Sequence, residues 1–113
     1  MKKILVVDDD YDIADAVKFI LMHKGYDVRT LSDGVNLQEM VRDYQPNLIL
    51  LDVRLPGSKS GIELCKELKK IYSIPIILFS AEHKIAYEEC SADNFIAKPF
   101  RRGYLLEMVN SYF

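Results

Sequence analysis

Five short runs of apolar residues alternate with longer amphipathic segments along the chain. Three runs are almost uninterrupted, at residues 4–7, 48–51 and 74–79, and two weaker runs occupy residues 26–31 and 94–97. Continuous apolar runs of this length, bounded by turn-forming residues, are typical of strands that are covered on both faces. The pattern therefore predicts five strands of a buried sheet.

Between the runs, apolar residues recur at intervals of three and four, which places them on one face of a helix. The four stripes are Ile13, Val17, Ile20 and Leu21; Leu37, Met40, Val41 and Tyr44; Leu64, Leu68, Ile71 and Tyr72; and Leu105, Met108, Val109 and Tyr112. Gly25 and Pro46 follow the first two stripes and fit helix ends. Ser60 and Glu63 fit a capping box before the third.

Alternating strands and helices predict an α/β fold: a doubly wound, five-stranded parallel sheet of the (βα)5, flavodoxin-like kind with helices on both faces. The 113 residues suit one domain over residues 1–113, with no output domain expected. Lys98 comes only 18 positions after Ser80, and the chain between them must hold a loop, a helix, a loop and a strand. We therefore expect a shortened fourth helix of about two turns.

Composition narrows the class of function. The net charge is −2, which argues against general nucleic-acid binding or membrane-surface binding, since both usually need a basic excess. No apolar run approaches the roughly 20 residues of a membrane span, and the N-terminus does not fit a signal peptide. We expect a cytoplasmic protein, a monomer or weak dimer, whose Cys65 and Cys90 are reduced, semi-buried thiols without metal-ligand spacing.

Polar residues stand where four of the predicted strands end. They are three carboxylates, one hydroxyl and one amine: Asp8, Asp9, Asp52, Ser80 and Lys98. In parallel sheets the carboxyl ends of the strands meet at one edge, and ligands bind there near the point where the strand order reverses. We therefore expect these five side chains to converge.

Three clustered carboxylates repel one another unless a cation joins them. Oxygen ligands in small number suit Mg²⁺, which keeps several waters and often bridges to a phosphate. Lys98 can supply a positive charge and Ser80 a donor to phosphoryl oxygens. Asp52 can then act as the carboxylate nucleophile that accepts a phosphoryl group.

Four segments, "ILVVDDD", "LILLDVRLP", "IILFSA" and "FIAKPF", resemble in order the signature segments of response-regulator receiver domains of two-component signal transduction (the CheY-like superfamily). The resemblance covers nearly the whole chain. It implies that Asp52 is the phospho-acceptor and Asp9 a direct Mg²⁺ ligand. It further implies that Asp8 acts on the metal largely through water, and that the backbone carbonyl of Arg54 completes the protein ligands.

The same resemblance gives Ser80 and Lys98 the role of phosphoryl contacts and Phe95 that of a switch aromatic, with a cis peptide bond common before Pro99. It implies a phosphorylation-activated switch rather than an enzyme with a separate substrate, with self-catalysed phosphotransfer and dephosphorylation. The expected partners are a sensor histidine kinase or histidine phosphotransfer protein, and a downstream protein.

Arg54 and Glu82 lie two residues after Asp52 and Ser80, at positions that tune the loss of phosphate in this family. Their opposite charges predict a pair across the mouth of the site; two solvated charges are the alternative.

Several residues have simpler interpretations. Asp10 fits a helix cap, and Phe95 fits core packing nearly as well as switching. Arg101 and Arg102 begin the last helix, where a cation opposes the helix dipole. They are either tolerated solvated charges or a basic patch for an acidic partner.

Two other functions stay open. A Mg²⁺-dependent phosphohydrolase with an aspartyl-phosphate intermediate would need an acid two residues after the nucleophile, where Arg54 stands. A degenerate receiver that only docks to partners would have no need of Asp8, Asp9, Asp52 and Lys98 together.

Overall fold

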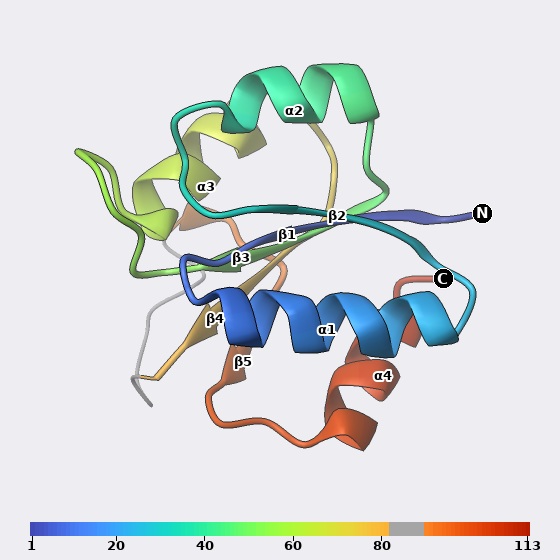
Figure 1. Cartoon of the computed structure of the whole chain (residues 1–113). Coiled ribbons are helices and arrows are strands. Elements are labelled where there is room, and N and C mark those ends of the chain that lie inside the picture. Colours follow the sequence, from blue (N-terminus) through green and yellow to red (C-terminus); the bar gives the residue numbers. More distant parts are fainter. Residues whose placement is uncertain (82–89) are drawn as a thin grey trace.

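A computed structural model of the chain describes residues 1–81 and 90–113 (Figure 1). Its elements, in chain order, are β1 (Lys3–Val7), α1 (Tyr11–His23), β2 (Asp27–Leu31), α2 (Leu37–Tyr44), β3 (Leu48–Asp52), α3 (Gly61–Ile71), β4 (Ile76–Ser80), β5 (Asn94–Ala97) and α4 (Arg102–Asn110). The five strands form one parallel sheet in the order β2-β1-β3-β4-β5. The predicted α/β fold with a doubly wound parallel sheet is confirmed.

Among the described residues, two helices cover each face of the sheet. Figure 1 shows α2 and α3 on one face and α1 and α4 on the other. Because successive side chains of a strand point to opposite faces, each strand feeds two separate cores: in β1, Leu5 and Val7 join the core beneath α2 and α3, and Ile4 and Val6 join the core beneath α1 and α4. This explains why the strands are apolar without alternation.

The strand order reverses at β1, which has β2 on one side and β3 on the other. In a doubly wound sheet the helices that follow these strands pass to opposite faces, so their N-terminal ends separate and leave room at the carboxyl ends of β1 and β3. Asp8 and Asp52 lie at this point of the sheet.

The helix ends follow local sequence rules. The Asp10 side chain accepts hydrogen bonds from the amides of Asp12 and Ile13 and so caps α1. Ser60 and Glu63 form the predicted capping box at α3. By contrast, α4 begins after Arg101 with no side-chain cap from any residue that the structure describes, and no acid occupies its first turn.

The largest error in a predicted strand boundary is at the start of β4. β4 begins at Ile76, two residues after the start of the apolar run at residue 74. Pro75 has no amide hydrogen to donate to a ladder, although its carbonyl oxygen accepts from the amide of Ile49 at 3.0 Å. The chain at Ile74 and Pro75 therefore leads into the strand without belonging to it.

The segment between β4 and β5 is described only in part. The shortened helix predicted between Ser80 and Lys98 falls mostly on residues 82–89, which lie outside the described residues, and it stays a prediction. Cys90 lies just after them and is buried, as is Cys65 on α3, whose Sγ lies 3.5 Å from the Cys90 carbonyl oxygen. The two thiols are therefore fully buried rather than semi-buried, and no disulfide joins this described pair.

None of the helices within residues 1–81 and 90–113 is long and apolar enough to cross a membrane.

Candidate functional site

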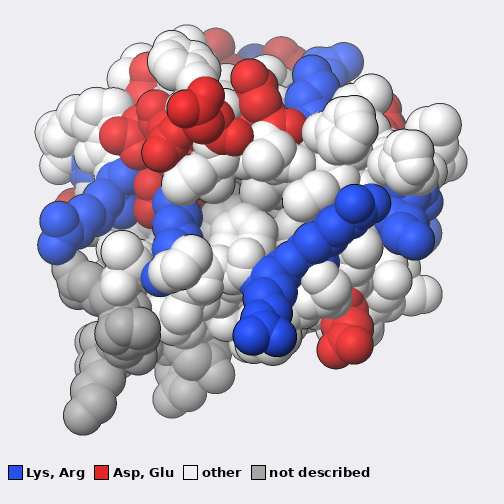
Figure 2. Space-filling view, turned by 60° about the horizontal axis from the view of Figure 1, so that its bottom comes forward, with Lys and Arg blue, Asp and Glu red and all other residues white. Residues whose placement is uncertain are grey.

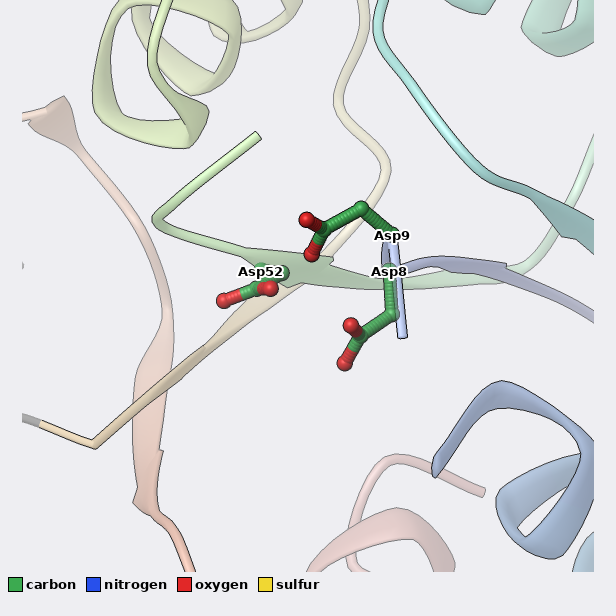
Figure 3. A group of neighbouring side chains, drawn as sticks. All are labelled: Asp8, Asp9 and Asp52. Atoms are coloured by element: carbon green, nitrogen blue, oxygen red, sulfur yellow. The ribbon is translucent and has the colours of Figure 1, made fainter. Parts of the chain in front are cut away.

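Three carboxylates meet at the carboxyl ends of β1 and β3 (Figure 3). Asp8 and Asp9 follow β1 directly, and Asp52 is the last residue of β3, the neighbouring strand. One carboxylate oxygen from each residue lies within 4.8 Å of the others. The three acids therefore converge, as the strand ends predicted.

A lysine from the far side of the sheet reaches this cluster. Lys98 follows β5, and its Nζ lies 2.8 Å from Asp8 Oδ2 and 3.4 Å from Asp52 Oδ2. The Lys98 amide donates to the Ser80 carbonyl oxygen at 2.7 Å, and its peptide bond to Pro99 is cis, as the resemblance implies. One ammonium group thus faces three carboxylates, so the cluster keeps a negative excess.

Asp8 is the most enclosed of the three acids, with a fully buried side chain. Its Oδ1 accepts from the amide of Asp10 at 2.9 Å, and its Oδ2 accepts from Lys98 Nζ. Both oxygens are therefore already engaged. Asp9, next in the chain, is exposed at the mouth of the cluster.

The Asp52 carboxylate is buried, with 5% of the residue exposed, and its Oδ1 accepts from the Arg54 amide at 3.3 Å. Burial raises the pKa of the Asp52 carboxyl to about 6, and the charge of Asp8 adds to the rise, against the opposing effect of Lys98. The negative charge on Asp52 is thus under-compensated, which favours the arrival of a cation.

The donor set fits a hard divalent cation. All three candidate side-chain ligands are carboxylates, one of them is open to solvent, and no nitrogen or sulfur ligand joins the cluster among the described residues. Oxygen ligands of this kind, with room for water, suit Mg²⁺. In the space-filling view, acidic side chains gather in one patch toward the start of α1, bordered by Lys and Arg side chains (Figure 2).

Of the remaining predicted residues, Ser80 ends β4 and is buried at the same edge. Phe95 lies on β5, partly buried against the core beneath α3, so its packing interpretation holds and its switching role stays a prediction. Arg54 is exposed just past β3. Glu82 lies outside the described residues, and its pairing with Arg54 stays untested.

The sequence did not single out Gly61, the first residue of α3, which lies against the backbone of Asp52. Its backbone φ is outside the left-handed region that would by itself require a glycine. No local pattern in the sequence marks this contact, because it arises only when α3 packs against the end of β3.

The chain is similar throughout to known signalling proteins. A family model for the response regulator receiver domain matches residues 4–110. The structure of NtrX from Brucella abortus in complex with ATP is 34% identical with a TM-score of 0.90, over 97% of this chain but 26% of that one. The chemotaxis response regulator CheY4 of Vibrio cholerae is 26% identical with a TM-score of 0.91, over 100% of this chain and 99% of that one.

The separate receiver domain of Brucella abortus NtrX is 34% identical with a TM-score of 0.88, over 96% of both chains. The chain therefore spans about a quarter of the longer NtrX chain and nearly all of CheY4.

Proposed function

Because the chain belongs to the response regulator receiver domain family, we propose that Asp52 accepts a phosphoryl group from a phosphohistidine on a sensor histidine kinase or histidine phosphotransfer protein. The family consists of signalling switches. One observation carries the proposal: Asp52 is a buried carboxylate at the end of β3, beside two more acids and within 3.4 Å of the Lys98 ammonium group.

The acidic cluster is the proposed metal site. Asp9, Asp52 and the backbone carbonyl of Arg54 would hold Mg²⁺ directly. Asp8 would act through water, because its oxygens are held by closer contacts than those of Asp52, at 2.9 Å from the Asp10 amide and 2.8 Å from Lys98 Nζ. Bound there, the ion would offset the repulsion between the carboxylates and the incoming phosphoryl oxygens.

The transfer needs a nucleophile and a way to hold the phosphoryl charge. An Asp52 carboxylate oxygen attacks phosphorus, the phosphorus–nitrogen bond of the phosphohistidine breaks, and that electron pair returns to the imidazole. Lys98 Nζ, now 3.4 Å from Asp52 Oδ2, is in reach of the new phosphoryl oxygens. The Ser80 hydroxyl can donate to another.

The switch follows from the positions of Ser80 and Lys98 in the sheet. They end β4 and follow β5, and their backbones are joined by the hydrogen bond from the Lys98 amide to the Ser80 carbonyl. Drawing both side chains toward a phosphoryl group on Asp52 would shift this edge of the sheet and the surface beside β5 and α4, with Phe95 on β5 as the proposed switch aromatic. A downstream protein in the cytoplasm would read that surface.

Intact-mass measurement tests this function. The chain is incubated with a small acyl phosphate and Mg²⁺, alongside Asp52→Asn and the exposed control Asp15→Asn. We expect one phosphoryl group on wild type and on Asp15→Asn, lasting minutes, and none on Asp52→Asn. Many turnovers of the donor per chain would instead indicate a phosphohydrolase, and no adduct on wild type would indicate a docking module.

A further inference from the structure

Gly61 occupies a place where a side chain has no room. A Cβ built on it would lie 2.0 Å from the carbonyl oxygen of Asp52 and 2.9 Å from the Cα of Val53. Both are backbone atoms, which cannot turn aside as the end of a side chain can. An added Cβ would therefore have to displace the chain at the end of β3.

The other glycines do not share this constraint. A Cβ at Gly34 would meet only the Leu64 side chain, with Cδ1 at 2.4 Å, and at Gly25, Gly57 and Gly103 it would meet no described atom within 4 Å. Among the described atoms, Gly61 is thus the one glycine of the five that is packed against backbone.

Hydrogen bonds tie the same piece of backbone to Gly61. The Gly61 amide donates to the Val53 carbonyl oxygen at 2.8 Å, and the Val53 amide donates to the Phe79 carbonyl oxygen at 3.0 Å. The next amide, that of Arg54, donates to the Asp52 carboxylate. The start of α3 therefore contacts the chain between Asp52, the proposed nucleophile, and Arg54, whose carbonyl is a proposed metal ligand.

If a Cβ at position 61 displaced the chain at the end of β3, the movement would be largest at the acidic site. The start of α3 is fixed by its capping box, and Leu64, Cys65 and Leu68 anchor the helix in the core. β3 is paired on both sides by β1 and β4 up to its last residues. The turn after Asp52 is the part left to move, and its Arg54 amide donates to the Asp52 carboxylate at 3.3 Å.

We propose that Gly61 is a positioning residue of the phospho-acceptor site. Because Gly61 lacks a Cβ, α3 can pack directly against the backbone of Asp52 and Val53. This packing fixes the positions of the Asp52 carboxylate and the Arg54 carbonyl. This inference rests on the proposed function of Asp52. With a Cβ present, the 2.0 Å approach must open to at least 3.0 Å. A shift of about 1 Å at reacting groups can cost on the order of 100-fold in rate.

The test compares Gly61→Ala with Leu21→Ala, which leaves a cavity in the separate core beneath α1 and α4, near the C-terminal end of α1. A second control is Gly103→Ala, which has open space. Mg²⁺ affinity is measured by calorimetric titration, and phosphorylation by an acyl phosphate at saturating Mg²⁺, both well below each melting temperature. For Gly61→Ala we expect Mg²⁺ affinity to fall about tenfold and the phosphorylation rate about 100-fold.

Leu21→Ala is expected to lower the melting temperature while keeping wild-type Mg²⁺ affinity and rate, and Gly103→Ala to match wild type. If Gly61→Ala also loses only stability, Gly61 is a packing residue and the proposal is overturned. If wild type takes no phosphate, the proposed function fails, and the Mg²⁺ titrations still decide the role of Gly61.

Should Gly61→Ala fail to fold, Ser60→Ala loosens the same helix start without adding an atom at position 61. A loss of Mg²⁺ affinity in Ser60→Ala but not in Leu21→Ala then supports the proposal, and unchanged affinity overturns it.

Discussion

Lys98 Nζ lies 2.8 Å from Asp8 Oδ2, although 90 positions separate the two residues in sequence. The contact spans the sheet edge, since Lys98 follows β5 and Asp8 follows β1, with the ends of β3 and β4 between them. The ammonium group thereby takes part of the place of a metal ion among the acids. Removing the Lys98 charge should therefore lower the stability of the metal-free protein and raise its affinity for a metal ion.

Lys98→Met should show this opposition. Removing the ammonium group leaves the fully buried Asp8 carboxylate uncompensated, and breaking a buried pair from one side costs about 3 kcal/mol or more. We expect a clear loss of stability in EDTA by urea denaturation, and a larger gain on adding Mg²⁺ than wild type shows, because the cation meets more unbalanced negative charge.

The exposed Lys66→Met serves as the control and should stay within about 0.5 kcal/mol of wild type. Equal stability of the two variants in EDTA would contradict the claim that Lys98 compensates the charge of the buried Asp8.

Asp52→Asn should stabilise the metal-free protein, more so at neutral pH than in acid. The pKa of Asp52 is raised to about 6 in the folded protein, above the ordinary value of 3.8 that it regains on unfolding. The folded state therefore binds the proton more tightly, so wild-type stability falls as pH rises from about 4 to about 6 and stays low above that. Asparagine cannot ionise and avoids this loss.

The shift corresponds to a gain of up to about 3 kcal/mol for Asp52→Asn at pH 7, fading toward pH 4. Urea denaturation in EDTA at both pH values measures it, with Asp15→Asn as the exposed control. A gain of the same size at the two pH values would rule out Asp52 ionisation as its cause.

The two acids after β1 should differ in their effect on Mg²⁺. Asp9 is exposed at the mouth of the cluster, whereas both oxygens of Asp8 already accept hydrogen bonds. We expect Asp9→Asn to lower Mg²⁺ affinity by about tenfold or more and Asp8→Asn by less, since a direct ligand contributes more than one acting through water. Equal affinities by calorimetric titration would contradict the assignment of direct ligation to Asp9.

The start of α4 should tolerate, and gain from, a reversal of charge. Arg101 stands at the cap position without a side-chain cap in the described structure, and Arg102 places a second cation at the positive end of the helix. Arg101→Asp should raise stability by about 1 kcal/mol in thermal unfolding.

If Arg101 and Arg102 also form a basic recognition patch, replacing both with Glu will slow phosphotransfer from the cognate kinase. An unchanged rate would show that the two arginines are only solvated charges.

The sequence predicted the features that depend on neighbouring residues. Continuous apolar runs marked the buried strands, and Asp10 and Ser60 marked helix starts, because strand burial and capping are set by short stretches of chain. Asp8, Asp52 and Lys98 could be brought together from sequence only because parallel strands end at one edge.

What stayed hidden depends on packing between distant segments. Nothing local distinguishes the buried Asp8 from the exposed Asp9, and nothing signals that the Cys65 thiol lies against the Cys90 backbone in the core. The fit of Gly61 against Asp52 likewise arises only when α3 seats on the sheet.

The most direct measurement locates the phosphoryl group by chemistry. Borohydride reduces an aspartyl phosphate to homoserine, so the phosphorylated chain is reduced, digested and sequenced by mass spectrometry, with Asp52→Asn treated in parallel. We predict homoserine at position 52 when Mg²⁺ and an acyl phosphate are both present, and none in EDTA or in the variant. Homoserine at Asp8 or Asp9 instead, or at no position, would contradict the role of Asp52 as the phospho-acceptor.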